Sequence, residues 1–181
     1  MTESVNRVRT DRRLRDLGVI NWVICRLAAR SVHAKHMHLF NVLGQHRTLF
    51  WSWLPFSGVL LGLGKLPRTD TELVILRVAH LRDCEYEQQH HSRIARRYGI
   101  DDALQARIAA GPRPKGVTRE DVLMRIVDEL VTERSLSLAN QKWLAYYYDQ
   151  RQTIEFCMLV GQYDALATTI SALQIPLDHA E

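Results

Sequence analysis

The stretch Asp83-Cys-Glu-Tyr-Glu-Gln-Gln-His-His-Ser-Arg-Ile-Ala-Arg-Arg-Tyr-Gly99 constrains this chain more than any other part of it. Cys84, Glu87 and His91 follow one another at intervals of three and four residues, so on an α-helix they line up along one face. A thiol, a carboxylate and an imidazole together supply a nucleophile, an acid or base, and a proton carrier. The spacing therefore predicts that these three residues belong to one active site.

Ile94 and Tyr98 continue the same line along the helix. We expect this stripe to face the protein interior, where polar groups are uncommon unless they have a role. His90 lies one residue off the stripe, so we expect it at the flank or on the surface. The helix is expected to begin at Asp83 as its cap and to end at Gly99, because glycine is typical of helix C-termini.

Outside this stretch the chain reads as a succession of helical patterns, with no convincing strand. Thr-Asp-Thr-Glu at residues 69–72 is a capping-box pattern, which predicts a helix start. Pro55 is expected to break the segment 46–64 into a helix and a loop. Residues 154–160 are apolar nearly all round, so we place the last helix at the centre of the bundle. The expected helical segments are 12–30, 32–43, part of 46–64, 69–81, 83–99, 101–110, one starting at Thr118, 138–148 and 150–174.

Length and composition indicate the class of protein. A chain of 181 residues suffices for one domain with a hydrophobic core and is short for two, and 46% hydrophobic with 24% charged residues is typical of a soluble globular protein. Residues 1–36 are expected to form a basic N-terminal arm and helix, and residues 37–178 the main helical domain. Acidic residues interrupt the arginines of the arm, so we expect no nucleic-acid partner.

We also expect no membrane partner and a cytoplasmic location. The longest apolar run, residues 53–63, is interrupted by Pro55 and is too short to span a bilayer. The three cysteines, Cys25, Cys84 and Cys157, are odd in number and far apart, which argues against a disulfide framework and favours a reducing compartment. Cys25 and Cys157 lie on apolar helical faces and are expected in the core.

Three segments together resemble the carboxymuconolactone decarboxylase-like, or alkylhydroperoxidase D-like, superfamily. They are residues 64–79, Cys84-Glu-Tyr-Glu-Gln-Gln-His-His91, and Phe156-Cys-Met-Leu-Val-Gly-Gln-Tyr-Asp-Ala-Leu-Ala167, and the resemblance covers residues 37–178. The resemblance implies a single-domain, all-α helical bundle that acts on a small molecule. It also implies a homo-oligomer, a trimer or hexamer, with the active site near a subunit interface.

The resemblance extends to individual residues. Glu72 matches the glutamate of the alkylhydroperoxidase motif, Cys84 the first cysteine of its Cys-x-x-Cys pair, and His91 its histidine. Glu87 stands in place of the second cysteine, so the disulfide that would resolve an oxidised thiol is lost. Tyr86-Glu87 instead resembles the lactone decarboxylase branch, which relies on acid–base groups.

We therefore expect a small, mostly apolar pocket with acid–base chemistry. His91 is expected to act as the general acid or base and Glu87 as its orienting partner, with Glu72 as a second carboxylate and Cys84 as a polar wall. No cofactor and no metal are expected. His33, His36 and His38 do not make a metal site, because only the first two share a helical face and no fourth ligand is evident.

Each site residue also has a purely structural reading. Glu72 suits a helix start, and Cys84 can be an inert buried thiol, because neighbouring acidic residues oppose a thiolate. Glu87 and His91 can stabilise their helix as an i,i+4 pair. Two other functions therefore stay open: a one-cysteine alkylhydroperoxidase of the peroxiredoxin type with Cys84 as the peroxidatic thiol, and a non-catalytic oligomeric or ligand-binding protein.

The segment from Trp51 to Leu66 is almost continuously apolar. It is more apolar surface than a small bundle easily covers, and such surface usually marks an interface. We therefore expect a second copy of the chain to cover part of it.

Overall fold

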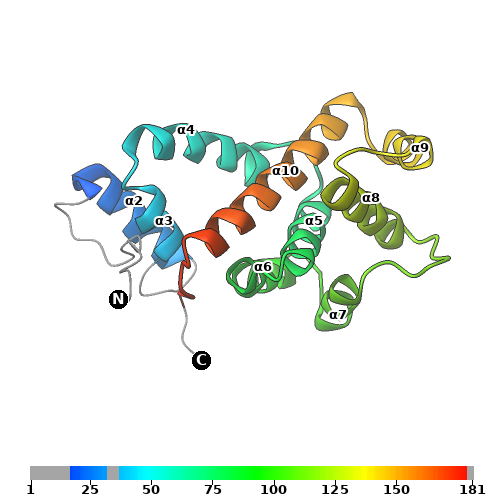
Figure 1. Ribbon diagram of the computed structural model, residues 1–181, viewed down its shortest axis with the longest axis horizontal. Coiled ribbons are helices and arrows are strands. Elements are labelled where there is room, and N and C mark those ends of the chain that lie inside the picture. The colour runs from blue at the N-terminus through cyan, green and yellow to red at the C-terminus, as the bar shows by residue number, and fades with distance from the viewer. Residues whose placement is uncertain (1–16, 32–36, 179–181) are drawn as a thin grey trace, which may run out of the picture. The chain divides into compact units, whose positions relative to one another are not determined.

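The computed structural model describes residues 17–31 and 37–178, and every regular element among them is a helix (Figure 1). The predicted all-α class is thus confirmed for these residues, whereas residues 1–16 of the predicted basic arm lie outside them. The elements are α2 (Val19–Ser31), α3 (His38–Leu43), α4 (Arg47–Gly58), the π-helix η1 (Val59–Leu63), α5 (Arg68–Leu81), α6 (Glu85–Arg97), α7 (Asp102–Ala110), α8 (Arg119–Glu133), α9 (Leu138–Tyr147) and α10 (Gln150–Ala172).

The chain forms two compact units, which we describe separately. The first unit runs to Ser57 and resumes at Thr169, and the second comprises residues 58–168. Every helix among the described residues is too short or too polar to traverse a bilayer.

The first unit is built around an aromatic core. Leu17, Cys25 and Phe50 are buried there, and the ring of Phe40 meets Phe50 edge to face at 5.8 Å and Trp53 at 5.4 Å. The core position predicted for Cys25 is confirmed, and burial raises the pKa of its thiol to about 11. This cysteine is therefore an apolar packing group.

The second unit is built around α5. All ten residues from Asp70 to Ala79 are buried, because α6, α7, α8 and η1 pack against this helix from different sides. A helix enclosed in this way has no solvent-facing side on which to place its polar residues. Each polar residue of α5 therefore needs a partner inside the protein.

The central position predicted for the last helix is wrong. Along α10, Phe156, Leu159 and Val160 are buried, but Ile154 and Met158 are 59% and 49% exposed. Cys157 is half-buried and not fully in the core as predicted. The apolar segment 154–160 therefore forms one buried face and one exposed apolar face of α10.

The ends of the helices around α5 differ from the predicted caps. The helix α5 begins at Arg68 with Pro67 before it, so Thr69 opens no capping box; its hydroxyl donates to the Tyr98 carbonyl at 3.3 Å. Cys84, not Asp83, occupies the N-cap of α6. Asp83 instead takes a left-handed conformation with φ 48° in the two-residue turn before it. Glu72 is thereby released from capping and points into the unit.

Two predicted boundaries are confirmed. Gly99 follows the end of α6 with φ 84°, a conformation that favours glycine. Thr118 caps α8, where its side chain accepts a hydrogen bond from the Asp121 amide at 3.4 Å. The glycine and threonine signals therefore predict these two helix ends correctly.

Pro55 does not break its helix as predicted. It lies inside α4, and the chain stays helical through Gly58 and continues as the π-helix η1. A π-helix leaves backbone groups with altered partners, and such segments occur frequently at functional sites. Here the carbonyl of Leu61 accepts a hydrogen bond from the Arg68 guanidinium, which ties η1 to the first turn of α5.

Candidate active site

Glu72 is the deepest acidic side chain of α5 and has no exposed surface. Its two oxygens face different partners: Oε1 accepts from Arg68 Nη2 at 2.5 Å, and Oε2 lies 2.7 Å from His91 Nδ1. A buried carboxylate requires such charged partners, because burial otherwise disfavours its ionised form. The arrangement links the first turn of α5 to the middle of α6.

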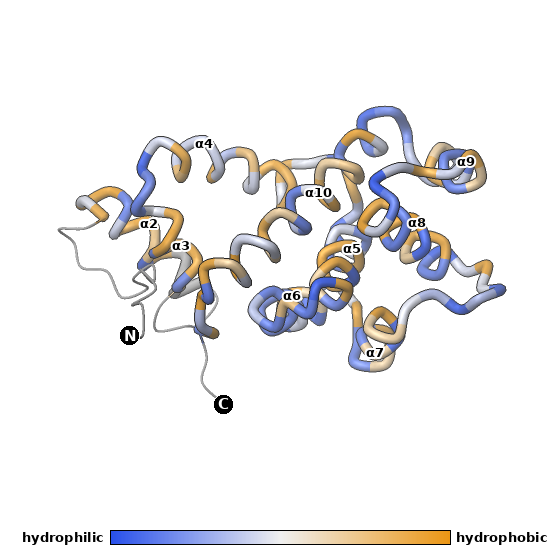
Figure 2. The backbone as a smooth tube through the Cα atoms, in the orientation of Figure 1, coloured by the Kyte–Doolittle hydropathy of each residue, from blue (hydrophilic) through white to orange (hydrophobic). Residues whose placement is uncertain are grey.

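His91 lies between two carboxylates. Its Nδ1 faces Glu72 at 2.7 Å, and its Nε2 is 3.4 Å from Glu87 Oε2, one helical turn before it on α6. Helix α6 is hydrophilic along most of its length (Figure 2), yet Glu87 and His91 are both buried. The predicted sharing of one helical face by these two residues is confirmed, and the structure adds Glu72 from α5 to them.

The pKa of His91 follows from this enclosure. Burial acts to lower it, but the charge of Glu72 and hydrogen bonds to Glu72 and Glu87 outweigh burial and raise the pKa from 6.5 to about 9. At neutral pH the imidazole is therefore mainly protonated, with both ring nitrogens as donors. Nδ1–H then donates to Glu72, and Nε2–H is directed toward Glu87 and Tyr163.

Tyr163 of α10 lies in the site but was not among the predicted catalytic residues. Its hydroxyl lies 3.2 Å from His91 Nε2, and its ring meets the imidazole edge to face at 5.2 Å. Burial, with the carboxylates of Glu87 and Glu72, raises the pKa of Tyr163 well above its ordinary value. The phenol therefore stays neutral. No local spacing could connect it to a histidine 72 positions earlier.

Arg68 was also missed, although a signal for it exists. It stands four residues before Glu72, the spacing at which oppositely charged side chains meet on a helix. Its guanidinium stacks over the Tyr98 ring at 4.8 Å. Arg68 thus binds Oε1 of Glu72, and Oε2 is left to His91.

Cys84 lies beside this group but outside its hydrogen bonds. Burial raises the pKa of its thiol to about 11; the amides of Glu87 and Tyr86 act to lower it, and the Glu87 carboxylate acts to raise it. The thiol is therefore protonated at neutral pH and a poor nucleophile. All three cysteines of the chain are free in the structure.

The buried face of α6 comprises partly different residues from those predicted. Ile94 is only half-buried and Tyr98 is 43% exposed, whereas His90 is buried, with its ring 4.8 Å from Tyr86. Ala95 completes the buried side. The buried residues of α6 therefore lie on both the Glu87–His91 line and the Tyr86–His90 line.

Two buried polar atoms of the group have no hydrogen-bond partner among the described residues. They are Glu87 Oε1 and Arg68 Nε. Buried carboxylate oxygens and guanidinium N–H groups are nearly always paired, so each such atom needs an explanation. The four charged groups form the sequence Arg68, Glu72, His91 and Glu87, and the unpaired atoms lie at its two ends.

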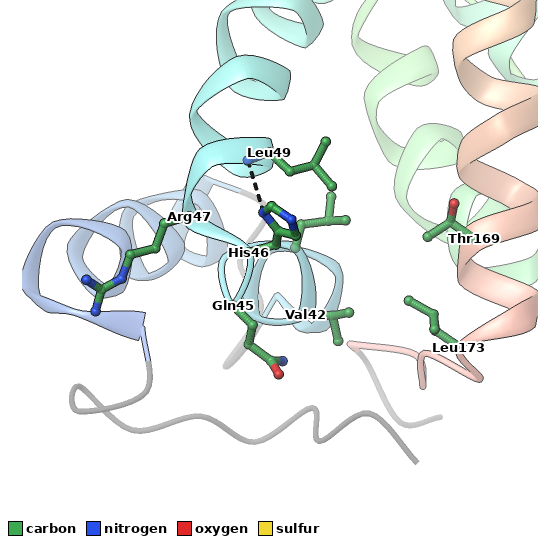
Figure 3. A pocket seen from close by; sticks show the side chains of 8 residues that line it. Val42, Gln45, His46, Arg47, Leu49, Thr169 and Leu173 are labelled. Atoms are coloured by element: carbon green, nitrogen blue, oxygen red, sulfur yellow. Dashed lines mark hydrogen bonds between the residues drawn. The ribbon is translucent and has the colours of Figure 1, made fainter. Parts of the chain in front are cut away.

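Three cavities lined by described residues lie away from Cys84, Glu87, His91 and Glu72. The predicted mostly apolar pocket is not one of these three, and the four residues lie in and beside a buried charged network. One of the three cavities, a groove of about 620 Å³, belongs to the first unit (Figure 3). There Val42 and Leu49 face Thr169 and Leu173 across the groove.

Comparison with known proteins gives a family model that matches part of the chain and a solved structure of similar fold. The model of the carboxymuconolactone decarboxylase family matches residues 47–129, which include Glu72, Cys84, Glu87 and His91. Among solved structures, an uncharacterized peroxidase-related protein from Silicibacter sp. TM1040 is similar with a TM-score of 0.76 and 12% identity. The similarity covers 97% of this chain and 94% of that one. No curated protein matches.

Proposed function

We propose that this chain is a member of the carboxymuconolactone decarboxylase-like superfamily and an enzyme that transfers protons to and from a small organic substrate. The observation that carries the proposal is the position of His91, buried between Glu72 at 2.7 Å and Glu87 at 3.4 Å with Tyr163 beside it. Titratable groups that shift one another's charge state in a buried site are typical of acid–base catalysis.

The two carboxylates have different roles in this proposal. Glu72 holds the Nδ1 side of the ring and has both oxygens occupied, so it orients His91 and supports its charge. Glu87 has one oxygen near His91 Nε2 and a second without a partner among the described residues. Glu87 is therefore the proton acceptor, and the orienting role predicted for it from the sequence passes to Glu72.

His91 is the matching acid. In its protonated form Nε2–H can deliver a proton to a substrate oxygen while Glu87 Oε1 removes one from the substrate. Tyr163, whose hydroxyl stays protonated, positions the Nε2 side and can donate a hydrogen bond to the same oxygen. One proton leaves the substrate and one returns to it, so the cycle needs neither an oxidant nor a reductant.

A thiol peroxidase is the alternative that the comparison supports, since the similar solved structure is described as peroxidase-related. The environment of Cys84 argues against a peroxidase, because a thiol with a pKa of about 11 is protonated at neutral pH and the thiolate is the form that attacks a peroxide. Glu87 in place of a second thiol also removes the usual resolving partner. A non-catalytic ligand-binding protein is the remaining alternative.

Three substitutions separate these functions in steady-state assays on hydroperoxides and small lactones. His91→Ala should lower kcat about 10²–10⁴-fold, since a positioned acid or base contributes that much. Glu87→Gln should lower kcat and change the pH profile, whereas Cys84→Ser should keep most of the activity. The exposed His46 in the first unit provides the control His46→Ala, which should leave kcat unchanged.

The alternatives give different patterns. A peroxidase would lose its activity in Cys84→Ser, because serine cannot form a sulfenic acid, and would keep it in His91→Ala. A binding protein would turn over no substrate, and the variants would alter only its stability or assembly. Circular dichroism of each variant checks that lost activity does not reflect lost folding.

We also propose a homo-oligomer, a trimer or hexamer, in the cytoplasm. Exposed apolar side chains on η1 and α10 support an interface with a second copy: Leu63 is 78% exposed and Ile154 is 59% exposed.

A further inference from the structure

We infer that the site around His91 binds an uncharged small molecule that carries a hydroxyl-type hydrogen-bond donor, and that it discriminates against carboxylates. The inference rests on the proposed function, since it names the substrate class of that same site. It departs from what the family's description suggests, because a carboxymuconolactone carries a carboxyl group.

The first support is the charge balance of the network. Arg68 pairs with Glu72, and His91 lies between Glu72 and Glu87, so two cations and two carboxylates are joined in one chain of contacts. The network is neutral when His91 is protonated and carries one negative charge when it is not. In neither state does it offer an excess cation to an anionic ligand, so burying a carboxylate there would be unfavourable.

The surroundings do not change this balance. The charged groups that act on Tyr163 are the two carboxylates and Arg68, which already belong to the network. Asp70 of α5 forms an ion pair with Arg119 at 2.6 Å and also accepts a hydrogen bond from the Tyr148 hydroxyl, so this pair adds no net charge. Arg77 is likewise fully engaged, with Asp128 and with the Ile108 carbonyl.

The second support is the unpaired oxygen of Glu87. Glu87 is only 4% exposed, and its Oε1 accepts no hydrogen bond from any described residue. A buried carboxylate oxygen of this kind is satisfied by a donor, and a ligand O–H supplies one. At the other end of the network, Arg68 Nε–H lacks an acceptor among the same residues. The ring of Tyr163 offers the apolar part of such a ligand an aromatic contact.

Matched probes test the inference without any turnover. Isobutanol and isobutyrate share a carbon skeleton, as do benzyl alcohol and benzoate, and benzyl methyl ether removes only the donor of benzyl alcohol. Binding to the full-length protein is measured by calorimetry at pH 7, with the His91 ring resonances followed to localise each probe. The alcohol of the pair that binds should bind at least about tenfold more tightly than its carboxylate or the ether, as expected for a lost charged hydrogen bond.

Glu87→Gln provides the decisive comparison. The change removes one negative charge from the network, so it should weaken alcohol binding and strengthen carboxylate binding, and the preference should shrink about tenfold or reverse. Glu85→Gln is the matched control, because Glu85 lies two residues earlier on the same helix and is exposed. It makes the same change in net charge and should leave the preference unaltered.

Three results would overturn the inference: a carboxylate that binds the unmodified protein as tightly as its alcohol, an unchanged preference in Glu87→Gln, or no binding of any probe. Failure of this inference can be distinguished from failure of the proposed function. Loss of turnover in His91→Ala with a carboxylated substrate would keep the acid–base function and reject the substrate class. A preference for alcohols without turnover of any substrate would keep the ligand class and reject the acid–base function.

Discussion

His91 shows how two chemically identical neighbours acquire different roles. Glu72 is anchored on its far side by Arg68 and lies 2.7 Å from the ring, whereas Glu87 lies 3.4 Å away with one oxygen unpaired. In the proposed mechanism the closer carboxylate supports the charge on the ring, and the more distant one accepts the substrate proton. A difference of less than 1 Å would thus separate the orienting group from the reacting one.

The charge of His91 also contributes to stability. Its pKa is raised from 6.5 to about 9 in the folded protein, so the folded state binds its proton more tightly than the unfolded state does. This contribution is fully present below pH 6.5 and is lost as the pH rises through about 9. The ion pairs of His91 with Glu72 and Glu87 thus stabilise both the fold and the protonated form of His91 below about pH 9.

At the scale of the elements, the turn between η1 and α5 positions Arg68. Glu155 of α10 accepts hydrogen bonds from the amides of Lys65 at 2.5 Å and Leu66 at 3.2 Å. A Cβ at Gly64 would fall 1.9 Å from Glu155 Oε1, so any larger residue there would push this carboxylate away from the two amides. The turn therefore depends on space at residue 64 and not on an unusual backbone angle.

Gly64→Ala should consequently lower the free energy of unfolding by roughly 0.5–1.5 kcal/mol for each hydrogen bond that Glu155 loses. Thermal or urea denaturation followed by circular dichroism measures it. Gly62→Ala is the control, because a Cβ there meets nothing within 4 Å, and it should be neutral or stabilise by about 0.4–1 kcal/mol. In a Glu155→Ala background Gly64→Ala should cost little; an undiminished cost there would contradict the explanation.

The limits of the sequence are clearest at this same scale. Glu87 and His91 were predicted because their relation is local, four residues apart on one helix. The complete burial of Glu72 was not predicted. It arises because four other elements enclose α5, whereas the sequence alone suggested a helix cap at this position. Tyr163 and the unpaired oxygen of Glu87 depend on how separate helices meet, and no spacing within one segment carries that information.

A related limit applies to α5, where Asp70 and Arg77 are also buried. Asp70 is satisfied by Arg119 and Tyr148, and Arg77 by Asp128 and two carbonyl groups of α7. The sequence shows these three charged residues in one helix and does not indicate which of them belongs to a site. Their partners do, because among the contacts of these three side chains within the described residues, those of Glu72 alone lead to unpaired buried atoms.

For the whole molecule, the exposed apolar side chains predict self-association. Static light scattering at micromolar concentration should give a multiple of the 20.9 kDa chain mass. Leu63→Glu should shift the protein toward the monomer, because a charge in an apolar interface is costly. Val117→Glu is the matched control: Val117 is also 78% exposed but lies in the loop before α8, and its change should leave the mass unaltered. A monomer of the unmodified chain would refute the prediction.

The central claim is that the folded protein holds a protonated His91 between two carboxylates, and a titration of the intact chain tests it most directly. Nitrogen-15 shifts of the imidazole, assigned by the resonance lost in His91→Gln, can be followed from pH 5 to pH 10. We predict a midpoint near pH 9, with both ring nitrogens protonated at pH 7, and a lower midpoint in Glu72→Gln. A midpoint at or below 6.5 in the unmodified protein, or no change in Glu72→Gln, would contradict the account.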